Sequence, residues 1–205
     1  MDYSLYLCTE RSYLSDTTLE QAVEDAIEGG CTVVQLREKD CDSKEYYELA
    51  KSLKKITDSH GVPLIIDDRV DIALAVDAAG VHVGQSDLPA DVVRRILGPG
   101  KIIGVTAKTL EQAKKAKADG ADYLGVGAMY PSTTKTDAIG IGKETLQQIC
   151  QEVDLPVVAI GGITADKVPE LKKCGIAGVA VISAILGAKD RKASAIEFRK
   201  VWEEP

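Results

Sequence analysis

The sequence predicts an α/β fold, a single (β/α)8 or TIM barrel that spans residues 1–205. Short apolar runs alternate with amphipathic helical patterns from one end of the chain to the other. These runs are rich in valine, isoleucine, alanine and glycine, which suits strands that are buried on both faces. Strands that are separated by helices pair in parallel, and eight such units in about 200–250 residues fit a closed barrel.

The expected strands, in chain order, are Leu5–Cys8, Thr32–Leu36, Leu64–Ile66, Gly80–Val83, Ile102–Thr106, Tyr123–Val126, Val157–Ile160 and Gly178–Ile182. Periodicity predicts helices near 18–29, 43–58, 89–96, 109–118, 143–151, 165–173 and 190–203, with a short one near 70–77. Capping residues precede the first helix, and glycines follow several of the others. An open, doubly wound sheet is the competing architecture. It is less favoured because no G-x-G-x-x-G motif follows the first strand and the eight units have nearly equal lengths.

Composition narrows the class of protein. The chain is 45% hydrophobic and 28% charged, a balance typical of soluble globular domains, and its net charge of −7 argues against nucleic acid or an anionic membrane as a partner. No apolar run approaches the roughly 20 residues that span a bilayer. The five cysteines form no C-x-x-C motif, so we expect reduced core residues in a soluble, cytoplasmic protein.

The segment Gln35-Leu36-Arg37-Glu38-Lys39 carries polar residues directly into the end of a predicted buried strand. Side chains alternate across a strand, so Gln35, Arg37 and Lys39 should point to the same side. Buried cations are costly unless an anion pairs with them, and a phosphate ester is a common partner. The pattern predicts an anion site, with a solvated strand edge as the alternative.

Other polar residues also follow the strands, where barrel enzymes place their active sites. The run Gly161-Gly162 and the pair Ile182-Ser183 end the last two strands, where backbone N–H groups commonly bind phosphate. The alternative is a tight turn without a ligand. Thr106 ends the fifth strand and lies at the same end of the predicted barrel.

Two carboxylates, Asp68 and Asp87, follow neighbouring strands. One or two carboxylates, completed by phosphate oxygens and water, are typical of a Mg²⁺ site. Ion pairs with Arg37, Lys39 and Lys135 are the alternative, but the cations are too numerous for two acids. A diphosphate with Mg²⁺ balances the charges better.

The loop after the sixth strand is rich in hydroxyl groups, which suit a phosphate when they lie beside a lysine. Its candidates are Ser132, Thr133, Thr134 and Lys135. A lid over the substrate is one interpretation and plain surface is the other. His82 lies inside a strand and is interpreted as a core histidine rather than a proton shuttle, and His60 as a helix cap. These two histidines cannot form a Ser-His-Asp, Cys-His or metal-histidine cluster.

These motifs, taken in order, resemble the thiamine-phosphate synthase family. The matching segments are Q-L-R-E-K at 35–39, D-D-R at 67–69, G-Q-S-D at 84–87, G-V-T at 104–106, Y-P-S-T-T-K at 130–135, I-G-G-I at 160–163 and V-I-S at 181–183. The resemblance implies a Mg²⁺-dependent barrel transferase with two small-molecule substrates. It would join 4-amino-2-methyl-5-(diphosphooxymethyl)pyrimidine to a thiazole phosphate, releasing diphosphate and thiamine phosphate through a carbocation-like intermediate.

The resemblance also implies roles for individual residues. Arg37, Lys39 and Lys135 would hold the diphosphate, and Asp68 and Asp87 the Mg²⁺. The pyrimidine would be bound by Gln35, Asp67 and Thr106, and the thiazole phosphate by Ser132, Thr133, Thr134, Gly162, Ile182 and Ser183. Lys39, Thr106 and Lys135 would be catalytic.

This chain departs from the family pattern at two places. Asp67 stands where the family usually has asparagine, so an acid that cannot donate a hydrogen bond unless protonated replaces an amide. The segment after Lys135 also lacks an expected proline. The first departure bears on recognition of the pyrimidine, and the second on the geometry of the lid.

Two other functions remain open from the sequence. A related thiazole tautomerase would carry a catalytic histidine where this chain has Ala128. A barrel that binds thiamine phosphates without turnover is the non-enzymatic alternative. The sequence does not give the oligomeric state, a homo-oligomer included, or the preference between thiazole phosphate forms.

Overall fold

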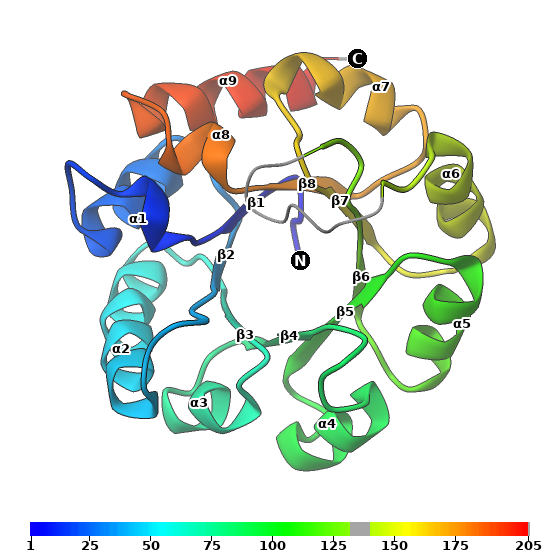
Figure 1. Ribbon diagram of the computed structural model, residues 1–205, viewed down its shortest axis with the longest axis horizontal. Helices are drawn as coiled ribbons and strands as arrows, with labels where there is room; N and C mark the ends of the chain where they lie inside the picture. The colour runs from blue at the N-terminus through cyan, green and yellow to red at the C-terminus, as the bar shows by residue number, and fades with distance from the viewer. Residues whose placement is uncertain (132–139, 205) are drawn as a thin grey trace.

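The computed structural model describes residues 1–131 and 140–204 and contains a closed barrel of eight parallel strands. Each strand pairs with the next in the chain, and β8 pairs with β1 to close the ring (Figure 1). The strands are β1 Leu5–Cys8, β2 Val33–Leu36, β3 Leu64–Asp67, β4 Gly80–Val83, β5 Ile102–Ala107, β6 Tyr123–Gly127, β7 Val157–Ile160 and β8 Gly178–Val181. The predicted (β/α)8 barrel is therefore confirmed, and the open sheet is wrong.

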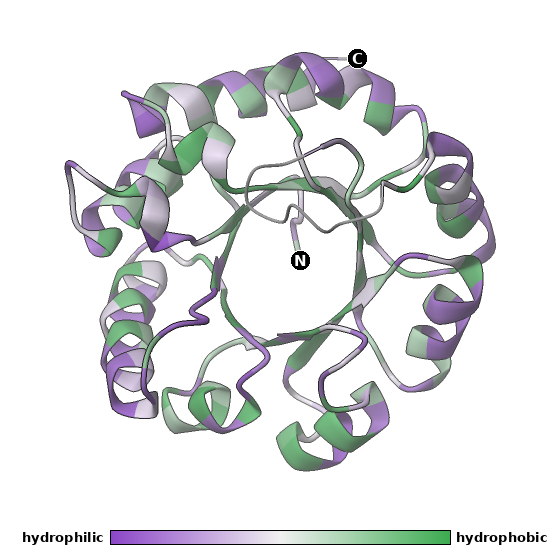
Figure 2. Cartoon of the chain, in the orientation of Figure 1, coloured by the Kyte–Doolittle hydropathy of each residue, from purple (hydrophilic) through white to green (hydrophobic). Residues whose placement is uncertain are grey.

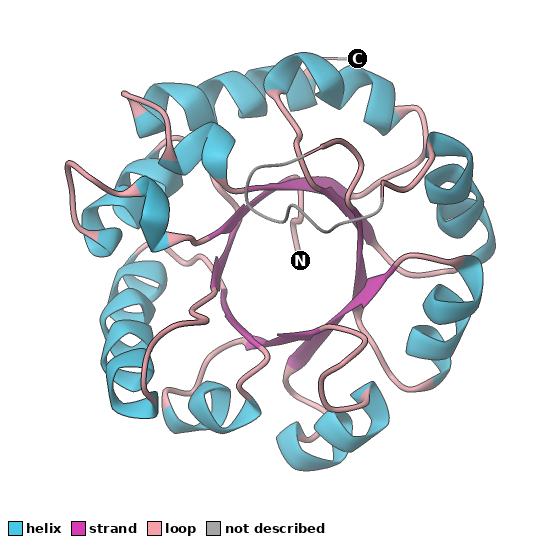
Figure 3. Cartoon of the chain, in the orientation of Figure 1, coloured by secondary structure: helices cyan, strands magenta, loops and turns pink. Residues whose placement is uncertain are grey.

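Helices surround the barrel (Figures 1 and 3). They are α1 Leu19–Glu28, α2 Ser43–Ser59, α3 Val70–Ala75, α4 Ala90–Leu97, α5 Leu110–Ala118, α6 Lys143–Glu152, α7 Val168–Lys172, α8 Ser183–Leu186 and α9 Arg191–Glu203. The sequence prediction missed α8, as well as the 3₁₀ turn Arg11–Tyr13. Each of these elements is a single turn long, too short to show a helical period.

The hydrophobic core forms two layers. The larger layer lies between the strands and the helices, whose apolar faces point toward the barrel (Figure 2). The smaller layer fills the barrel interior and includes Tyr3, Tyr6 and Tyr123. The rings of Tyr3 and Tyr123 lie 4.9 Å apart between centroids. Because Tyr3 precedes β1, these rings fill the amino end of the barrel and leave the carboxyl end open to the site.

Helix α2 shows how the sequence holds together the two strand ends that carry several of the predicted site residues. The Asp42 side chain caps this helix by accepting from the Glu45 backbone N–H at 2.8 Å. One turn later the buried Tyr46 hydroxyl lies 2.8 Å from the Leu36 carbonyl and 3.0 Å from the Asp67 carbonyl. It therefore bridges the ends of β2 and β3, from which several of the predicted site residues project.

Two smaller expectations are also tested. Each cysteine is free, as predicted, but only Cys8, Cys31 and Cys174 are buried in the core, whereas Cys41 and Cys150 are partly exposed. His60 caps the end of α2, and its Nδ1 lies 3.0 Å from the Ile56 carbonyl. Within residues 1–131 and 140–204, the helices are all too short or too polar to cross a membrane.

Candidate active site

A cavity of about 790 Å³ opens at the carboxyl end of the barrel, and all eight strands contribute to its wall. Most of the residues that the sequence placed at the site line it: Gln35, Arg37, Lys39, Asp67, Asp68, Asp87, Thr106 and Ile182. Gly162 and Ser183 line a smaller adjoining hollow of about 30 Å³, which shares Ile182. Ser132, Thr133, Thr134 and Lys135 lie outside the described residues.

The end of β2 places three polar side chains on the cavity wall, as the strand alternation predicted. The Gln35 amide donates to the Tyr6 hydroxyl at 2.8 Å. Arg37 donates to the Glu10 carboxylate at 2.6 Å, while its buried Nε makes no hydrogen bond within the described part of the chain. Lys39 forms ion pairs with Asp67 and Asp68. Gln35 is buried and Arg37 is half-buried, so the alternative of a solvated strand edge is wrong for these two side chains, whereas Lys39 is exposed.

Asp67, the acid that replaces an expected amide, is held between the two cations. Its carboxylate lies 2.9 Å from the Lys39 ammonium and 3.9 Å from the Arg37 Nε. Burial alone would lower the pKa of Lys39, but hydrogen bonds to Asp68 and Asp67 raise it. Lys39 is thus held as a cation, and part of its charge is already neutralised by this chain's own acids.

Asp68 and Asp87 face each other across the gap between β3 and β4. Asp87 accepts from the Gly84 backbone N–H at 2.7 Å. Burial raises the pKa of the Asp87 carboxyl, and the neighbouring Asp68 carboxylate raises it further. Asp68 takes a left-handed backbone conformation with φ 58°, which aspartate tolerates better than most residues.

This pair of carboxylates fits a Mg²⁺ ion. Two adjacent, mutually repelling carboxylates attract a divalent cation, and Mg²⁺ commonly takes one or two carboxylates and completes its shell with water and phosphate oxygens. Over residues 1–131 and 140–204 there is no cluster of three or more His, Cys, Asp or Glu side chains suited to a metal. With these two carboxylates, a Mg²⁺ ion here would need water and substrate oxygens to complete its shell.

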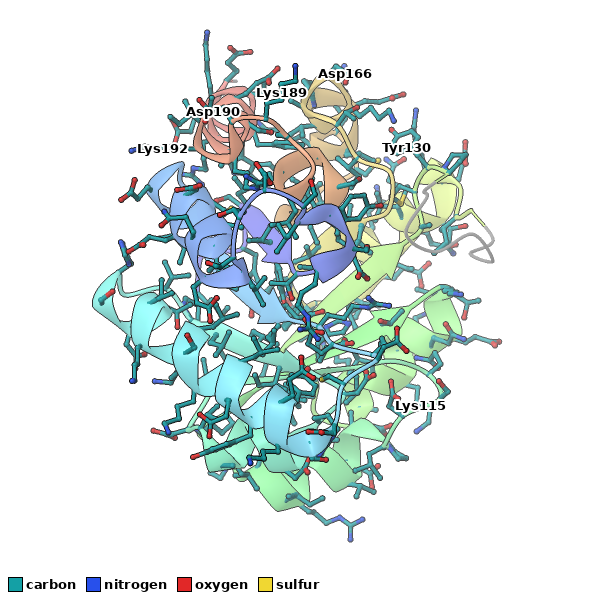
Figure 4. All side chains as sticks on the ribbon, turned by 60° about the vertical axis from the view of Figure 1, so that its left-hand side comes forward. Lys115, Tyr130, Asp166, Lys189, Asp190 and Lys192 are labelled. Atoms are coloured by element: carbon teal, nitrogen blue, oxygen red, sulfur yellow. The ribbon has the colours of Figure 1, made fainter. Side chains whose placement is uncertain are left out.

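The loops after β6 and β7 approach each other closely. Gly161 and Gly162 have φ values of 104° and 61°, and a Cβ on Gly161 would lie 2.6 Å from the Ala128 Cα. The Lys167 ammonium donates to the Gly162 carbonyl at 2.8 Å and lies 4.3 Å from the centroid of the Tyr130 ring. Tyr130, labelled in Figure 4, belongs to the loop after β6, so the loops after β6 and β7 meet here.

His82 departs partly from its predicted role. Both ring nitrogens are hydrogen-bonded, Nδ1 to the Tyr123 hydroxyl at 3.0 Å and Nε2 to the Thr106 hydroxyl at 2.9 Å, so the histidine is satisfied as expected. It is not sealed in the core, however, because its half-buried ring lines the cavity. The reason is that His82 faces the barrel interior at the level where the cavity begins.

Sequence reasoning also missed other residues that line the cavity: Tyr6, Tyr123, Gln85 and Lys108. Lys108 had a usable signal, because it directly follows β5, two positions after Thr106, where continued strand alternation would put it on the same side. The tyrosines had none, because their neighbours inside the barrel depend on how strands far apart in sequence are registered.

A closed (β/α)8 barrel whose carboxyl end carries a charged cavity defines this protein as a barrel enzyme. A family model described as thiamine monophosphate synthase matches residues 5–185. The chain therefore belongs to the thiamine monophosphate synthase family.

Individual relatives agree with this assignment. The chain is 55% identical to the thiamine-phosphate synthase of Ruminiclostridium cellulolyticum, over 98% of this chain and 96% of that protein. It is 53% identical to the thiamine-phosphate synthase of Clostridium tetani, over 100% and 98% of the two chains. A solved structure of thiamine phosphate pyrophosphorylase from Pyrococcus furiosus superposes with a TM-score of 0.91 at 42% identity, covering 98% of this chain and 96% of that one.

Proposed function

We propose that this chain is a Mg²⁺-dependent thiamine-phosphate synthase. It would join 4-amino-2-methyl-5-(diphosphooxymethyl)pyrimidine to a thiazole phosphate and release diphosphate and thiamine phosphate. One observation carries the proposal beyond family membership: Arg37, Lys39, Asp68 and Asp87 line a single cavity. Two cations beside two facing carboxylates suit a diphosphate ester that shares a divalent cation with the protein.

The diphosphate end of the substrate binds to Arg37 and Lys39 in this proposal, with Lys135 as a third cation. Lys39 exchanges its bonds to Asp67 and Asp68 for bonds to phosphate oxygens, which frees both carboxylates. Asp68 and Asp87 would hold Mg²⁺, which would neutralise charge on the leaving diphosphate. The side chains therefore stabilise the leaving group by electrostatics rather than by proton transfer.

The bond changes are those of a dissociative substitution. The C–O bond between the pyrimidine methylene and the diphosphate breaks, and its electron pair leaves with the diphosphate. The methylene cation is stabilised by the aminopyrimidine ring, and the thiazole nitrogen donates the pair that forms the new C–N bond. Gln35, Asp67 and Thr106 hold the ring, and the reaction needs no side-chain nucleophile.

The thiazole phosphate binds at the loops after β7 and β8. Gly162 and Ser183 offer backbone N–H groups beside Ile182 in the small hollow that joins the main cavity. Ser132, Thr133 and Thr134 complete this subsite in the proposal. The two substrates then enter one cavity from neighbouring loops, with the reacting methylene between them.

The proposal is tested by mixing the purified protein with both substrates and Mg²⁺ and measuring thiamine phosphate and diphosphate. Equal amounts of the two products are expected, and omission of Mg²⁺ with added EDTA should abolish both. A tautomerase would form neither product, and a non-catalytic barrel would bind the ligands without turnover. Ala128 lines the cavity, so the position of the tautomerase histidine holds no proton-transfer group. We also propose a cytoplasmic location, in line with the free cysteines.

A further inference from the structure

A continuous chain of hydrogen bonds crosses the barrel interior, and all five of its side chains line the cavity. It runs from Gln35 Nε2 to the Tyr6 hydroxyl at 2.8 Å, and from there to the Tyr123 hydroxyl at 2.7 Å. From Tyr123 it continues to His82 Nδ1 at 3.0 Å, and from His82 Nε2 to the Thr106 hydroxyl at 2.9 Å. These five side chains come from β2, β1, β6, β4 and β5. We call them the interior relay.

Both ends of the interior relay are residues that the proposed function assigns to the pyrimidine ring. The middle is deeply buried, since Tyr6 and Tyr123 are each 1% exposed. Burial raises the pKa of both phenols well above the ordinary value, so each stays neutral and keeps a single hydroxyl proton. Each hydroxyl can therefore donate only one hydrogen bond within the relay.

Two glycines make room for the relay. A Cβ on Gly104 would lie within 3.0 Å of both Tyr123 and His82, and a Cβ on Gly125 would lie 2.9 Å from His82 Cε1. Gly104 lies on β5 opposite Tyr123 of β6, and Gly125 lies on β6 opposite Thr106 of β5. The barrel thus has no side chain at two interior positions beside the rings of Tyr123 and His82. The relay is built into the packing of the barrel.

A relay with one proton per link has two orientations. In the first, Gln35 donates to Tyr6, Tyr6 to Tyr123, Tyr123 to His82 Nδ1, and His82 Nε2–H to Thr106. The amide oxygen and second N–H of Gln35, together with the Thr106 O–H, then remain for a ligand. In the second orientation every bond is reversed: Tyr6 donates to the Gln35 oxygen, and His82 carries its proton on Nδ1.

We propose that Tyr6, Tyr123 and His82 are positioning residues that couple the hydrogen-bond pattern at Gln35 to that at Thr106, and that an aminopyrimidine selects the first orientation. An amino N–H beside a ring nitrogen is a donor beside an acceptor, which matches the amide edge that this orientation exposes. The inference rests on the proposed function, because that function supplies the aminopyrimidine.

The tautomer of His82 reports the orientation directly. The chain contains two histidines, His60 and His82, so ¹⁵N NMR of the labelled wild-type protein yields two assignable imidazoles, and His60→Asn identifies them. The probe is 4-amino-5-hydroxymethyl-2-methylpyrimidine, which lacks the diphosphate and cannot react. We expect the Nε2–H tautomer in this complex. The 4-oxo analogue presents the inverted pattern, so we expect the Nδ1–H tautomer with it.

A variant pair tests the coupling energetically. Tyr123→Phe breaks the relay at its centre, and we expect the affinity for the aminopyrimidine alcohol to fall roughly 3- to 10-fold, the worth of one neutral hydrogen bond. The matched control is Tyr3→Phe, since Tyr3 stacks on Tyr123 but makes no hydrogen bond in the relay. The KM for the thiazole phosphate should change in neither variant.

Different experimental outcomes would overturn the relay proposal and the proposed function. An unchanged His82 tautomer with the two ligands, or equal affinities of Tyr123→Phe and Tyr3→Phe, would overturn the relay, while thiamine phosphate formation by the same wild-type preparation would leave the proposed function standing. If the wild-type protein formed no thiamine phosphate, the function would fail, and the relay proposal would fail with it.

Discussion

A single methyl group at Gly104 should destabilise the barrel and loosen the candidate site at the same time. The added Cβ would lie within 3.0 Å of the Tyr123 Cζ and hydroxyl and of the His82 Nδ1, whereas carbon atoms in ordinary contact lie about 3.5–4.0 Å apart. Because both rings are confined inside the barrel, they cannot move away freely. Overpacking of this kind costs about 1–3 kcal/mol. For a chain of this length, that corresponds to a fall in Tm of roughly 2–12 °C.

The assay is thermal unfolding followed by circular dichroism at pH 7.5 without ligands. Gly100→Ala is the matched control, because a Cβ on Gly100 meets no atom within 4 Å. We expect Gly100→Ala to stay within about 0.5 kcal/mol of the wild type. Gly104→Ala should also weaken binding of the aminopyrimidine alcohol, since His82 and Tyr123 must shift to admit the methyl group.

Two results would refute this reasoning. If Gly104→Ala unfolded at the wild-type temperature, the barrel would accommodate the methyl group without cost, and Gly104 would not be a required part of the packing. If Gly104→Ala lost stability but bound the aminopyrimidine alcohol with wild-type affinity, the positions of Tyr123 and His82 would not matter for recognition of the ring.

Further variants address the charged end of the cavity and its support. Asp87→Asn should lose activity at limiting Mg²⁺, measured by thiamine phosphate formation. The folded-state pKa of Asp87 is raised, so its ionisation opposes folding as pH rises through that pKa. Asp87→Asn should therefore stabilise the folded protein at pH 7 by about 0.2–1 kcal/mol, seen as a higher Tm, and have no effect near pH 3. Lys39→Met should raise the KM for the pyrimidine diphosphate roughly 10- to 100-fold and leave that for the thiazole phosphate unchanged. Asp67→Asn frees Lys39 from one of its two carboxylates, so calorimetry at constant Mg²⁺ should show inorganic diphosphate binding roughly 2- to 5-fold more tightly. Tyr46→Phe removes the hydroxyl that bridges the Leu36 and Asp67 carbonyls and should lower stability by about 0.5–1.5 kcal/mol in urea unfolding, because the Asp67 carbonyl keeps the Arg69 backbone N–H at 2.7 Å.

The fold could be predicted because a parallel barrel repeats one local rule. Each buried strand is a short apolar run between two helices, and strands such as Leu5–Cys8 and Val157–Ile160 have the bounds that the sequence predicted. Alternation along β2 likewise placed Gln35, Arg37 and Lys39 on the cavity wall. These features depend only on residues that are near one another in the chain.

The interior relay could not be predicted because it depends on register between distant strands. Tyr6 and Tyr123 are separated by 117 positions, yet their hydroxyls meet at 2.7 Å. In isolation each tyrosine is an apolar strand residue, and His82 is a polar interruption within a strand. Their partnership requires small residues at Gly104 and Gly125, whose significance appears only when β4, β5 and β6 are placed side by side.

The charges of the cavity explain why a metal ion and a diphosphate belong together in the proposed reaction. Among the residues that the structure describes, three cations, Arg37, Lys39 and Lys108, and three acids, Asp67, Asp68 and Asp87, line it. A diphosphate ester brings roughly two to three further negative charges at neutral pH. Without an added cation, Lys39 would exchange its bonds to carboxylates for bonds to phosphate oxygens with little gain in binding free energy. The carboxylates would then lose the cation that pairs with them. In the proposed complex, Mg²⁺ on the freed carboxylates would remove that penalty, so binding of the metal and binding of the diphosphate should each strengthen the other.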